Sequence, residues 1–285
     1  MNDAALTLDE QDFELSEMSP FGLLLRARRE GTKLEQIPVE VLRQLTRKHR
    51  LLLLRGFAQF ESAEALTKYC TTWGEIMMWP FGAVLELVEH ADPKDHIFDH
   101  TYVPVHWDGM YMPMIPAIQF FQCVNAPGDE SGGQTTFSDT IRILEDVDAK
   151  TRELWEKVTV TYRIEKVEHY GGKAVSPLIT RNPETGVPVL RYNEPPLDDV
   201  KFLNRPVLEF EGIAEDQVKE LQEGLRAAIY DPRHLYAHDW RTGDMVVSDN
   251  HALLHGRMAF TSGSKRHLRR VHILGNPPFK NPAIS

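Results

Sequence analysis

The chain has 285 residues, 42% of them hydrophobic and 26% charged, and a formal net charge of -10. This composition is typical of a globular protein with a sizeable core. The acidic balance argues against nucleic acid or an anionic membrane as partner, because both require clustered positive charge. The longest aliphatic run, residues 51–54, is far too short to cross a bilayer.

The cysteines and the first residues indicate a cellular compartment. Cys70 and Cys123 provide neither a disulfide framework nor zinc-finger spacing, which fits a reducing environment. The start of the chain is acidic and lacks the basic and apolar segments of a signal peptide. We therefore expect a cytoplasmic protein.

The sequence of the N-terminal quarter predicts two helices and two strands. Residues 1–20 are polar and acidic and are expected to form a loose lead-in. Residues 21–26 predict a strand, although so short an apolar run is also compatible with a helix. The leucine-rich residues 51–57 predict a strand buried on both faces. Helices are predicted after Pro38, which suits a first helical turn, and after Ser62, which suits an N-cap.

The rest of the chain alternates short strands with a few helical segments. It shows no internal repeat or clear linker, so residues 21–285 are interpreted as a single domain. Many short strands with few helices predict a mainly β fold with flanking helices, built as an antiparallel sandwich or barrel. Strands are predicted at residues 83–88, 117–124, 135–137, 158–164, 187–192, 244–248 and 269–274, and helices within residues 138–158 and 212–230.

Residues 103–111, Val-Pro-Val-His-Trp-Asp-Gly-Met-Tyr, contain a candidate metal site. Side chains two apart in a strand point to the same face, so His106 and Asp108 project together while Trp107 faces away. A second histidine, for which His255 is the best candidate, would complete the three-ligand face of non-haem Fe(II) oxygenases. The alternative is a strand-edge histidine that hydrogen-bonds its neighbour.

A second His-x-Asp copy, His90-Ala91-Asp92, fits a metal site less well. Asp92 precedes a proline within a charged run, which indicates a turn. We therefore prefer the copy at residues 106–108.

Several further polar and aromatic residues are candidates for a binding site. Arg266 offers the fork geometry that binds a carboxylate at two points, although the basic residues 265–270 fit a solvated face as well. Tyr111, Trp79 and Phe81 can line an aromatic substrate pocket or pack in a core. Two more histidines, His251 and His272, lack ligand spacing to the His106 pair and are interpreted as ordinary polar residues, and Arg257 is interpreted as structural.

The order of these motifs is more specific than any one of them. The set is His106-x-Asp108, Gly132-Gly133-Gln134-Thr135, Trp240-x-x-Gly243-Asp244, Asp249-Asn250, His255 and Arg266. It resembles the taurine dioxygenase/TfdA-type family of Fe(II)- and 2-oxoglutarate-dependent oxygenases, apart from Gln134, where that family often has aspartate. Residues 51–57, 79–88, 106–111, 253–257 and 267–272 are similar to tyrosine-isonitrile oxygenases of the PvcB type.

The resemblance implies a fold and a set of roles. The fold would be a double-stranded β-helix, or jelly roll. His106, Asp108 and His255 would bind Fe(II), and Arg266 with Thr135 would bind 2-oxoglutarate, leaving a position for O2. Arg270 would meet the anionic group of a small-molecule substrate, with Tyr111 as a further substrate contact.

The resemblance also implies an activity, the desaturation of a tyrosine-derived isonitrile in secondary metabolism. Two alternatives stay open at this point. One is a hydroxylase of the same family that acts on another amino-acid-like or sulfonate substrate. The other is a non-enzymatic, small-molecule-binding β-sandwich. A homo-oligomer is compatible with either.

Overall fold

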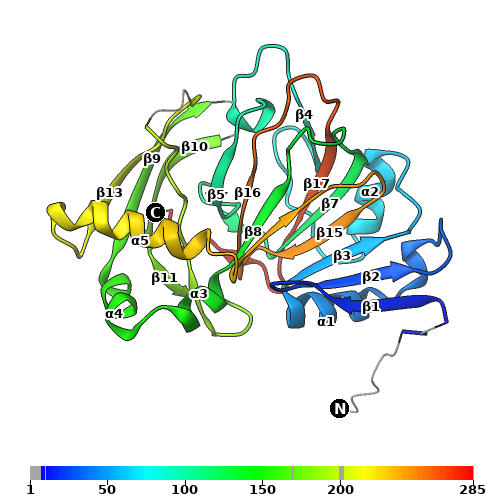
Figure 1. Cartoon of the computed structure of the whole chain (residues 1–285), viewed down its shortest axis with the longest axis horizontal. Helices are drawn as coiled ribbons and strands as arrows, with labels where there is room; N and C mark the ends of the chain where they lie inside the picture. The colour runs from blue at the N-terminus through cyan, green and yellow to red at the C-terminus, as the bar shows by residue number, and fades with distance from the viewer. Residues whose placement is uncertain (1–7, 10, 168–169, 199–201, 285) are drawn as a thin grey trace.

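The computed structural model describes residues 8–9, 11–167, 170–198 and 202–284 (Figure 1). It is mainly β with few helices, as the sequence predicts. The strands are β1 (Phe13–Glu17), β2 (Leu23–Ala27), β3 (Leu51–Arg55), β4 (Val84–Val88), β5 (Val103–His106), β6 (Met114–Ile115), β7 (Ile118–Asn125), β8 (Thr135–Asp139), β9 (Thr159–Val167), β10 (Tyr170–Pro177), β11 (Ile179–Arg181), β12 (Pro188–Leu190), β13 (Val207–Glu211), β14 (Leu235–His238), β15 (Met245–Asp249), β16 (Leu253–Arg257), β17 (His267–Ile273) and β18 (Phe279–Lys280). The helices are α1 (Val39–His49), α2 (Ala63–Cys70), α3 (Thr140–Asp146), α4 (Ala149–Lys157) and α5 (Val218–Ile229), with short 3-10 turns η1 (Leu34–Gln36), η2 (His96–Phe98) and η3 (Glu215–Gln217).

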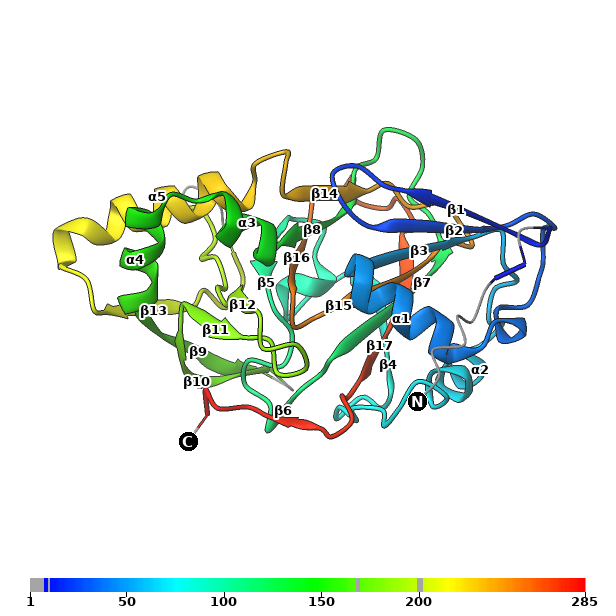
Figure 2. The ribbon, with the colours of Figure 1, turned by 90° about the horizontal axis from the view of Figure 1, so that it is seen from below.

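A seven-stranded sheet with the order β1-β2-β3-β15-β7-β17-β4 forms one side of the core. Its strand β3 is buried on both faces, as predicted. Leu52 and Leu54 belong to a hydrophobic cluster with residues of α1 and α2, whereas Leu51 and Leu53 belong to a second cluster that includes residues of β8 and β16. The helices therefore cover one face of this sheet, and a second sheet covers the other (Figure 2).

The second sheet has four strands in the order β14-β8-β16-β5. In the antiparallel pairing of β16 with β5, His255 lies directly opposite His106. Two predicted metal ligands from distant parts of the sequence are thus neighbours. Strand β16, which carries His255, shares the second hydrophobic cluster with β7 and β17 of the seven-stranded sheet.

A third layer lies at the opposite end of the molecule from β1 and β2 (Figures 1 and 2). It contains the sheet β10-β9-β13 together with α3, α4 and α5. Trp107 is buried in this layer, and the guanidinium of Arg191 lies 5.0 Å from its ring. The prediction that Trp107 faces away from His106 and Asp108 is confirmed.

Two sequence predictions need correction. Residues 13–17 of the expected lead-in form β1, which pairs with β2, while residues 1–7 and 10 lie outside the described residues. This strand has only two apolar side chains, Phe13 and Leu15, and Phe13 packs on Phe57, so it carried no clear hydrophobic signal. The helix expected over residues 212–230 begins only at Val218, after η3.

Other predictions are confirmed. Ser62 caps α2 by accepting a hydrogen bond from the N–H of Ala65, and Cys70 and Cys123 are both buried free thiols. Among the described residues, no helix is long and apolar enough to span a membrane.

Candidate metal centre

The structure brings His106, Asp108 and His255 together, with one potential ligand atom of each within 4.8 Å of the others. His106 is the last residue of β5, Asp108 follows two residues later, and His255 is the middle residue of β16. The Nε2 atom of His106 lies 3.6 Å from Oδ1 of Asp108, and that of His255 lies 3.5 Å from Oδ2. This is the three-ligand face that the sequence predicted.

The surroundings of both imidazoles suit metal binding. The Nδ1–H of His106 donates to the carbonyl of Pro104 at 2.9 Å, so Nε2 is the nitrogen that faces Asp108. Burial, and after it the neighbouring His106, lowers the pKa of His255 well below its usual range. A neutral imidazole is the form that coordinates a metal ion.

Asp108 is buried and is fixed through both its backbone and its side chain. Its N–H donates to the side-chain oxygen of Asn250 at 3.0 Å, and its carbonyl accepts from the amide of Asn250 at 3.0 Å. Its Oδ2 accepts hydrogen bonds from Gln119 and, at 2.7 Å, from His272, and it forms an ion pair with Arg270 at 2.8 Å. Burial alone would raise the pKa of Asp108, but Arg270, followed by His255 and His272, holds it well below the usual range.

Sequence reasoning missed two of these contacts. Gln119 was not singled out, although it is one of the polar residues in the largely buried strand β7. His272 was interpreted as an ordinary polar residue, and that interpretation was wrong. It lies two positions after Arg270 in β17, so both side chains point to the same face of the strand, and this spacing could have identified it. Burial lowers the pKa of His272 as well.

Arg266 shares a cavity with two of the metal candidates, His106 and His255. This cavity is lined by His106, His255, Thr135, Arg266 and Arg270, among others. Arg266 is buried, and its guanidinium donates to the carbonyl of Gly133 at 3.0 Å and to the hydroxyl of Thr135 at 3.4 Å. A Cβ at Gly133 would come within 3.0 Å of the Arg266 side chain, so glycine permits this approach.

The charge of Arg266 has no anionic partner among the ion pairs of the described residues. Burial, and after it Arg257, lowers the pKa of Arg266 to about 9. A buried cation without a counter-ion is costly. A ligand carboxylate would supply the missing charge in a geometry that matches the guanidinium.

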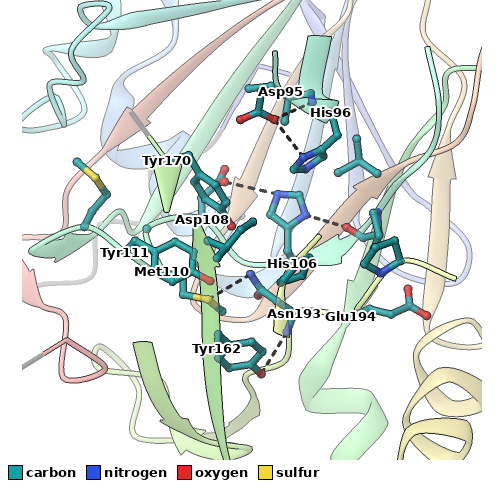
Figure 3. Close-up of a pocket in the computed structure, with 18 of the residues that line it drawn as sticks. Asp95, His96, His106, Asp108, Met110, Tyr111, Tyr162, Tyr170, Asn193 and Glu194 are labelled. Carbon is teal, nitrogen blue, oxygen red and sulfur yellow. Dashed lines mark hydrogen bonds and ion pairs between the residues drawn. The ribbon is translucent and has the colours of Figure 1, made fainter. Parts of the chain in front are cut away.

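A second cavity shares His106 and Arg270 with the first and is also lined by Asp108 and several aromatic side chains (Figure 3). Tyr111 and Tyr170 lie on the same side of His106 as Asp108 and contact each other edge to face, with ring centres 5.1 Å apart. Trp79 and Phe81 also line this cavity and stack at 5.7 Å. All three aromatic residues that the sequence analysis offered as possible lining residues are therefore in the wall.

A loop between β4 and β5 forms another part of the wall. It contains Asp95, His96 and Ile97. The sequence predicted a structural role for Arg257, and the structure identifies its contacts. Its guanidinium donates to the carbonyls of four residues in this loop: His96, Ile97, Asp99 and Thr101.

Arg270 borders both cavities. It lies within β17, whereas Arg266 precedes the first residue of this strand by one position. The strand predicted over residues 269–274, which includes Arg270, is confirmed. Arg270 is thus placed to face a second ligand beside the metal candidates.

The rejected His-x-Asp copy makes other contacts. His90 is exposed and stacks on Phe98 at 4.1 Å, and Asp92 pairs with Lys94 at 2.6 Å on the surface. The preference for residues 106–108 agrees with this geometry.

Comparison with known proteins gives the family. The model of the taurine catabolism dioxygenase TauD, TfdA family, matches residues 19–272. The chain belongs to this family of dioxygenases. It is 46% identical to a tyrosine isonitrile desaturase of Pseudomonas aeruginosa over 100% of this chain and 98% of that protein. It is 49% identical to a tyrosine isonitrile desaturase of Erwinia amylovora, over 94% and 92% of the two chains.

A solved structure of the same group has a closely similar fold. It is PvcB, described as an Fe, alpha-ketoglutarate dependent oxygenase from an isonitrile synthetic pathway. The TM-score is 0.83 at 44% sequence identity, and 97% of each chain is covered.

Proposed function

We propose that this protein is an Fe(II)- and 2-oxoglutarate-dependent oxygenase that desaturates a tyrosine-derived isonitrile at the bond beside the ring. The observation that carries the proposal is one cavity lined both by His106 and His255, which cluster with Asp108, and by the buried Arg266, which has no anionic partner among the ion pairs of the described residues. The substrate follows from the relatives, two of which are named for this reaction.

His106, Asp108 and His255 would hold the iron. Two neutral imidazoles and one carboxylate on one side of the ion are the donor set that suits non-haem Fe(II), and they leave about three positions open. When bound, iron together with 2-oxoglutarate and O2 supplies a two-electron oxidation of the substrate, with succinate, CO2 and water as the other products.

Arg266 and Thr135 would bind the distal carboxylate of 2-oxoglutarate. The guanidinium remains charged when it is desolvated, which favours arginine over lysine at this position. The Thr135 hydroxyl also accepts a hydrogen bond from Trp240 at 2.9 Å, so its position is fixed before a ligand arrives.

Arg270 would pair with the carboxylate of the organic substrate, and Tyr111, Trp79 and Phe81 would pack around its ring. These side chains would orient the carbon beside the ring toward the metal and exclude water from it. We further propose that the seven-stranded and four-stranded sheets together form the double-stranded β-helix typical of such oxygenases.

Product analysis tests the proposal. The wild-type protein is incubated with tyrosine isonitrile, Fe(II), 2-oxoglutarate and O2, and the organic product and succinate are quantified. We expect one succinate for each alkene formed. A hydroxylated product, or succinate release only with another amino-acid-like or sulfonate substrate, would favour the same-family hydroxylase. Absence of succinate with every substrate, together with absence of Fe(II) binding, would favour the non-enzymatic binding protein.

A further inference from the structure

The two oxygens of Asp108 have different surroundings. Oδ2 accepts hydrogen bonds from Gln119 and His272, forms an ion pair with Arg270 at 2.8 Å and lies 3.5 Å from Nε2 of His255. Oδ1 faces Nε2 of His106 at 3.6 Å. Each carboxylate oxygen has about two lone-pair sites, so the two hydrogen bonds occupy the capacity of Oδ2. The lone pairs left for a metal ion are on Oδ1.

A third residue, Trp79, determines which ring nitrogen of His272 donates a hydrogen bond. The indole N–H of Trp79 lies 3.0 Å from Nδ1 of His272. An indole nitrogen can only donate, so Nδ1 of His272 has to accept and carries no proton. The proton of the neutral ring is then on Nε2, where it donates to Asp108. Trp79 thereby fixes the tautomer of His272.

The Gln119 amide is fixed in a similar way. Its Oε1 accepts a hydrogen bond from the hydroxyl of Ser248 at 2.8 Å, which turns its Nε2 toward Asp108. Gln119 and His272 come from the neighbouring strands β7 and β17 of the seven-stranded sheet. The sheet opposite His106 and His255 therefore supplies the groups that hold the carboxylate.

On the basis of the proposed iron site, we propose that Trp79 and His272 act as positioning residues that reserve Oδ1 of Asp108 for the metal ion. The hydrogen bonds turn the carboxylate so that one oxygen is occupied by the protein and the other is presented to iron. Residues that orient metal ligands in this way typically change metal affinity 10- to 100-fold when they are mutated. Trp79 also lines the second cavity. The hydrogen bonds from Trp79 to His272 and from His272 to Asp108, which we call the relay, therefore connect the proposed substrate side of the site with a proposed metal ligand.

Three variants test this relay. His272→Leu removes the donor at similar volume, His272→Gln keeps an amide N–H on a side chain of similar reach, and Trp79→Phe keeps an aromatic ring but removes the indole N–H. Fe(II) affinity is measured by anaerobic titration of the metal-free proteins. Co(II), whose visible absorption depends on the number and geometry of its ligands, gives a second readout.

The control for His272 is His234→Leu. His234 is also buried and bonds a carboxylate, that of Asp146, at 2.9 Å, but it lies outside both cavities. Trp73→Phe is the control for Trp79, because Trp73 is a buried tryptophan that packs on Phe120 at 6.1 Å in the first hydrophobic cluster. Both controls match the loss of packing without touching Asp108.

We expect His272→Leu to lose roughly 10- to 100-fold in Fe(II) affinity and to change the Co(II) spectrum. His272→Gln should recover most of the affinity, Trp79→Phe should fall near the lower end of that range, and both controls should bind like wild type. Wild-type affinity in His272→Leu, or equal losses in the Leu and Gln variants, would overturn the relay. Failure of the wild type itself to bind Fe(II) would instead overturn the proposed function together with this inference.

Discussion

Asp108 and Asp249 are two aspartates enclosed by the same fold whose pKa values shift in opposite directions. Asp108 is buried beside Arg270, whose guanidinium lies 2.8 Å from Oδ2, and its pKa lies well below the usual range. Asp249 ends β15, and burial raises its pKa to about 6. Desolvation is the largest single influence on both, so it does not explain the difference.

The position of the cation next to each carboxylate explains why the pKa values of Asp108 and Asp249 shift in opposite directions. Arg191 lies near Asp249, but its guanidinium donates to the carbonyl of Asn250 at 2.9 Å and contacts Nδ1 of His251 at 3.0 Å. Glu184 repels the charge of Asp249 as well. Asp249 therefore accepts only backbone hydrogen bonds, from His251 and Ala252, in the contacts that the structure describes for it.

The comparison shows what distinguishes a ligand carboxylate from a structural one in this fold. An aspartate in the interior stays ionised when an arginine and two histidines face it, and it gains affinity for a proton when they do not. Three kinds of variant test this comparison. The first removes the carboxylate of Asp108, the second removes Arg266 or Arg270, and the third removes the charge of Asp249.

The largest effect is expected from Asp108→Ala. The variant lacks the only anionic member of the proposed metal site, so iron-dependent turnover should fall to the level of the protein-free reaction while the fold is retained. Turnover is followed by succinate release, and the fold by circular dichroism. Asp92→Ala, in the exposed His90-Ala91-Asp92 copy, is the matched control and should react like wild type. Near-wild-type turnover of Asp108→Ala would exclude the proposed ligands.

The next largest effects separate the two arginines. Arg266→Ala should mainly raise the KM for 2-oxoglutarate, because a buried carboxylate would lose its charged partner. Such a loss costs roughly 2–5 kcal/mol, which corresponds to about 30-fold to several-thousand-fold in affinity. Arg270→Ala should instead raise the KM for the organic substrate and leave that for 2-oxoglutarate nearly unchanged.

Both arginine variants are assayed at saturating Fe(II), because Arg270 also contacts Asp108. Equal effects of both substitutions on both Michaelis constants would contradict the division of roles.

The structure shows which parts of this site the sequence could predict. His106, Asp108 and His255 were predictable from the His-x-Asp pattern and the ordered family motifs, although the expected strand ends at His106 and Asp108 lies in the turn that follows. Gln119 was not predictable, and for His272 the two-residue spacing from Arg270 indicated only a shared strand face, because the contacts of both with Asp108 depend on how two sheets pack. No local pattern encodes the distance between sheets.

The same limit applies to the fold. Leucine-rich β3 was recognised from its composition, because burial on both faces requires apolar residues throughout the strand. The polar strand β1 was not recognised, because it is an edge strand whose pairing with β2 involves mainly backbone groups. Edge strands tolerate polar side chains, so composition says little about them.

The smallest effect is expected from Asp249→Asn, and it concerns stability. The folded-state pKa of about 6 exceeds the ordinary value of 3.8, so the folded protein favours the protonated form. The stability this provides is present below about pH 4 and is lost as the pH rises through 6. Asparagine removes the charge and keeps an oxygen for the N–H groups of His251 and Ala252.

The free energy of unfolding of Asp249→Asn should therefore exceed that of wild type at pH 7.5, by at most about 3 kcal/mol for a shift of about two pKa units. The difference should shrink toward pH 4. Urea unfolding at both pH values measures it. A variant that is less stable than wild type at pH 7.5 would show that Asp249 is ionised and stabilising, like Asp108.

The most direct test of the central claim is an anaerobic titration of Fe(II) into metal-free wild type, Asp108→Ala and Asp249→Asn. The account predicts that wild type and Asp249→Asn each bind one Fe(II) with similar affinity and that Asp108→Ala loses this binding. Wild-type binding by Asp108→Ala, or loss of binding by Asp249→Asn, would contradict it.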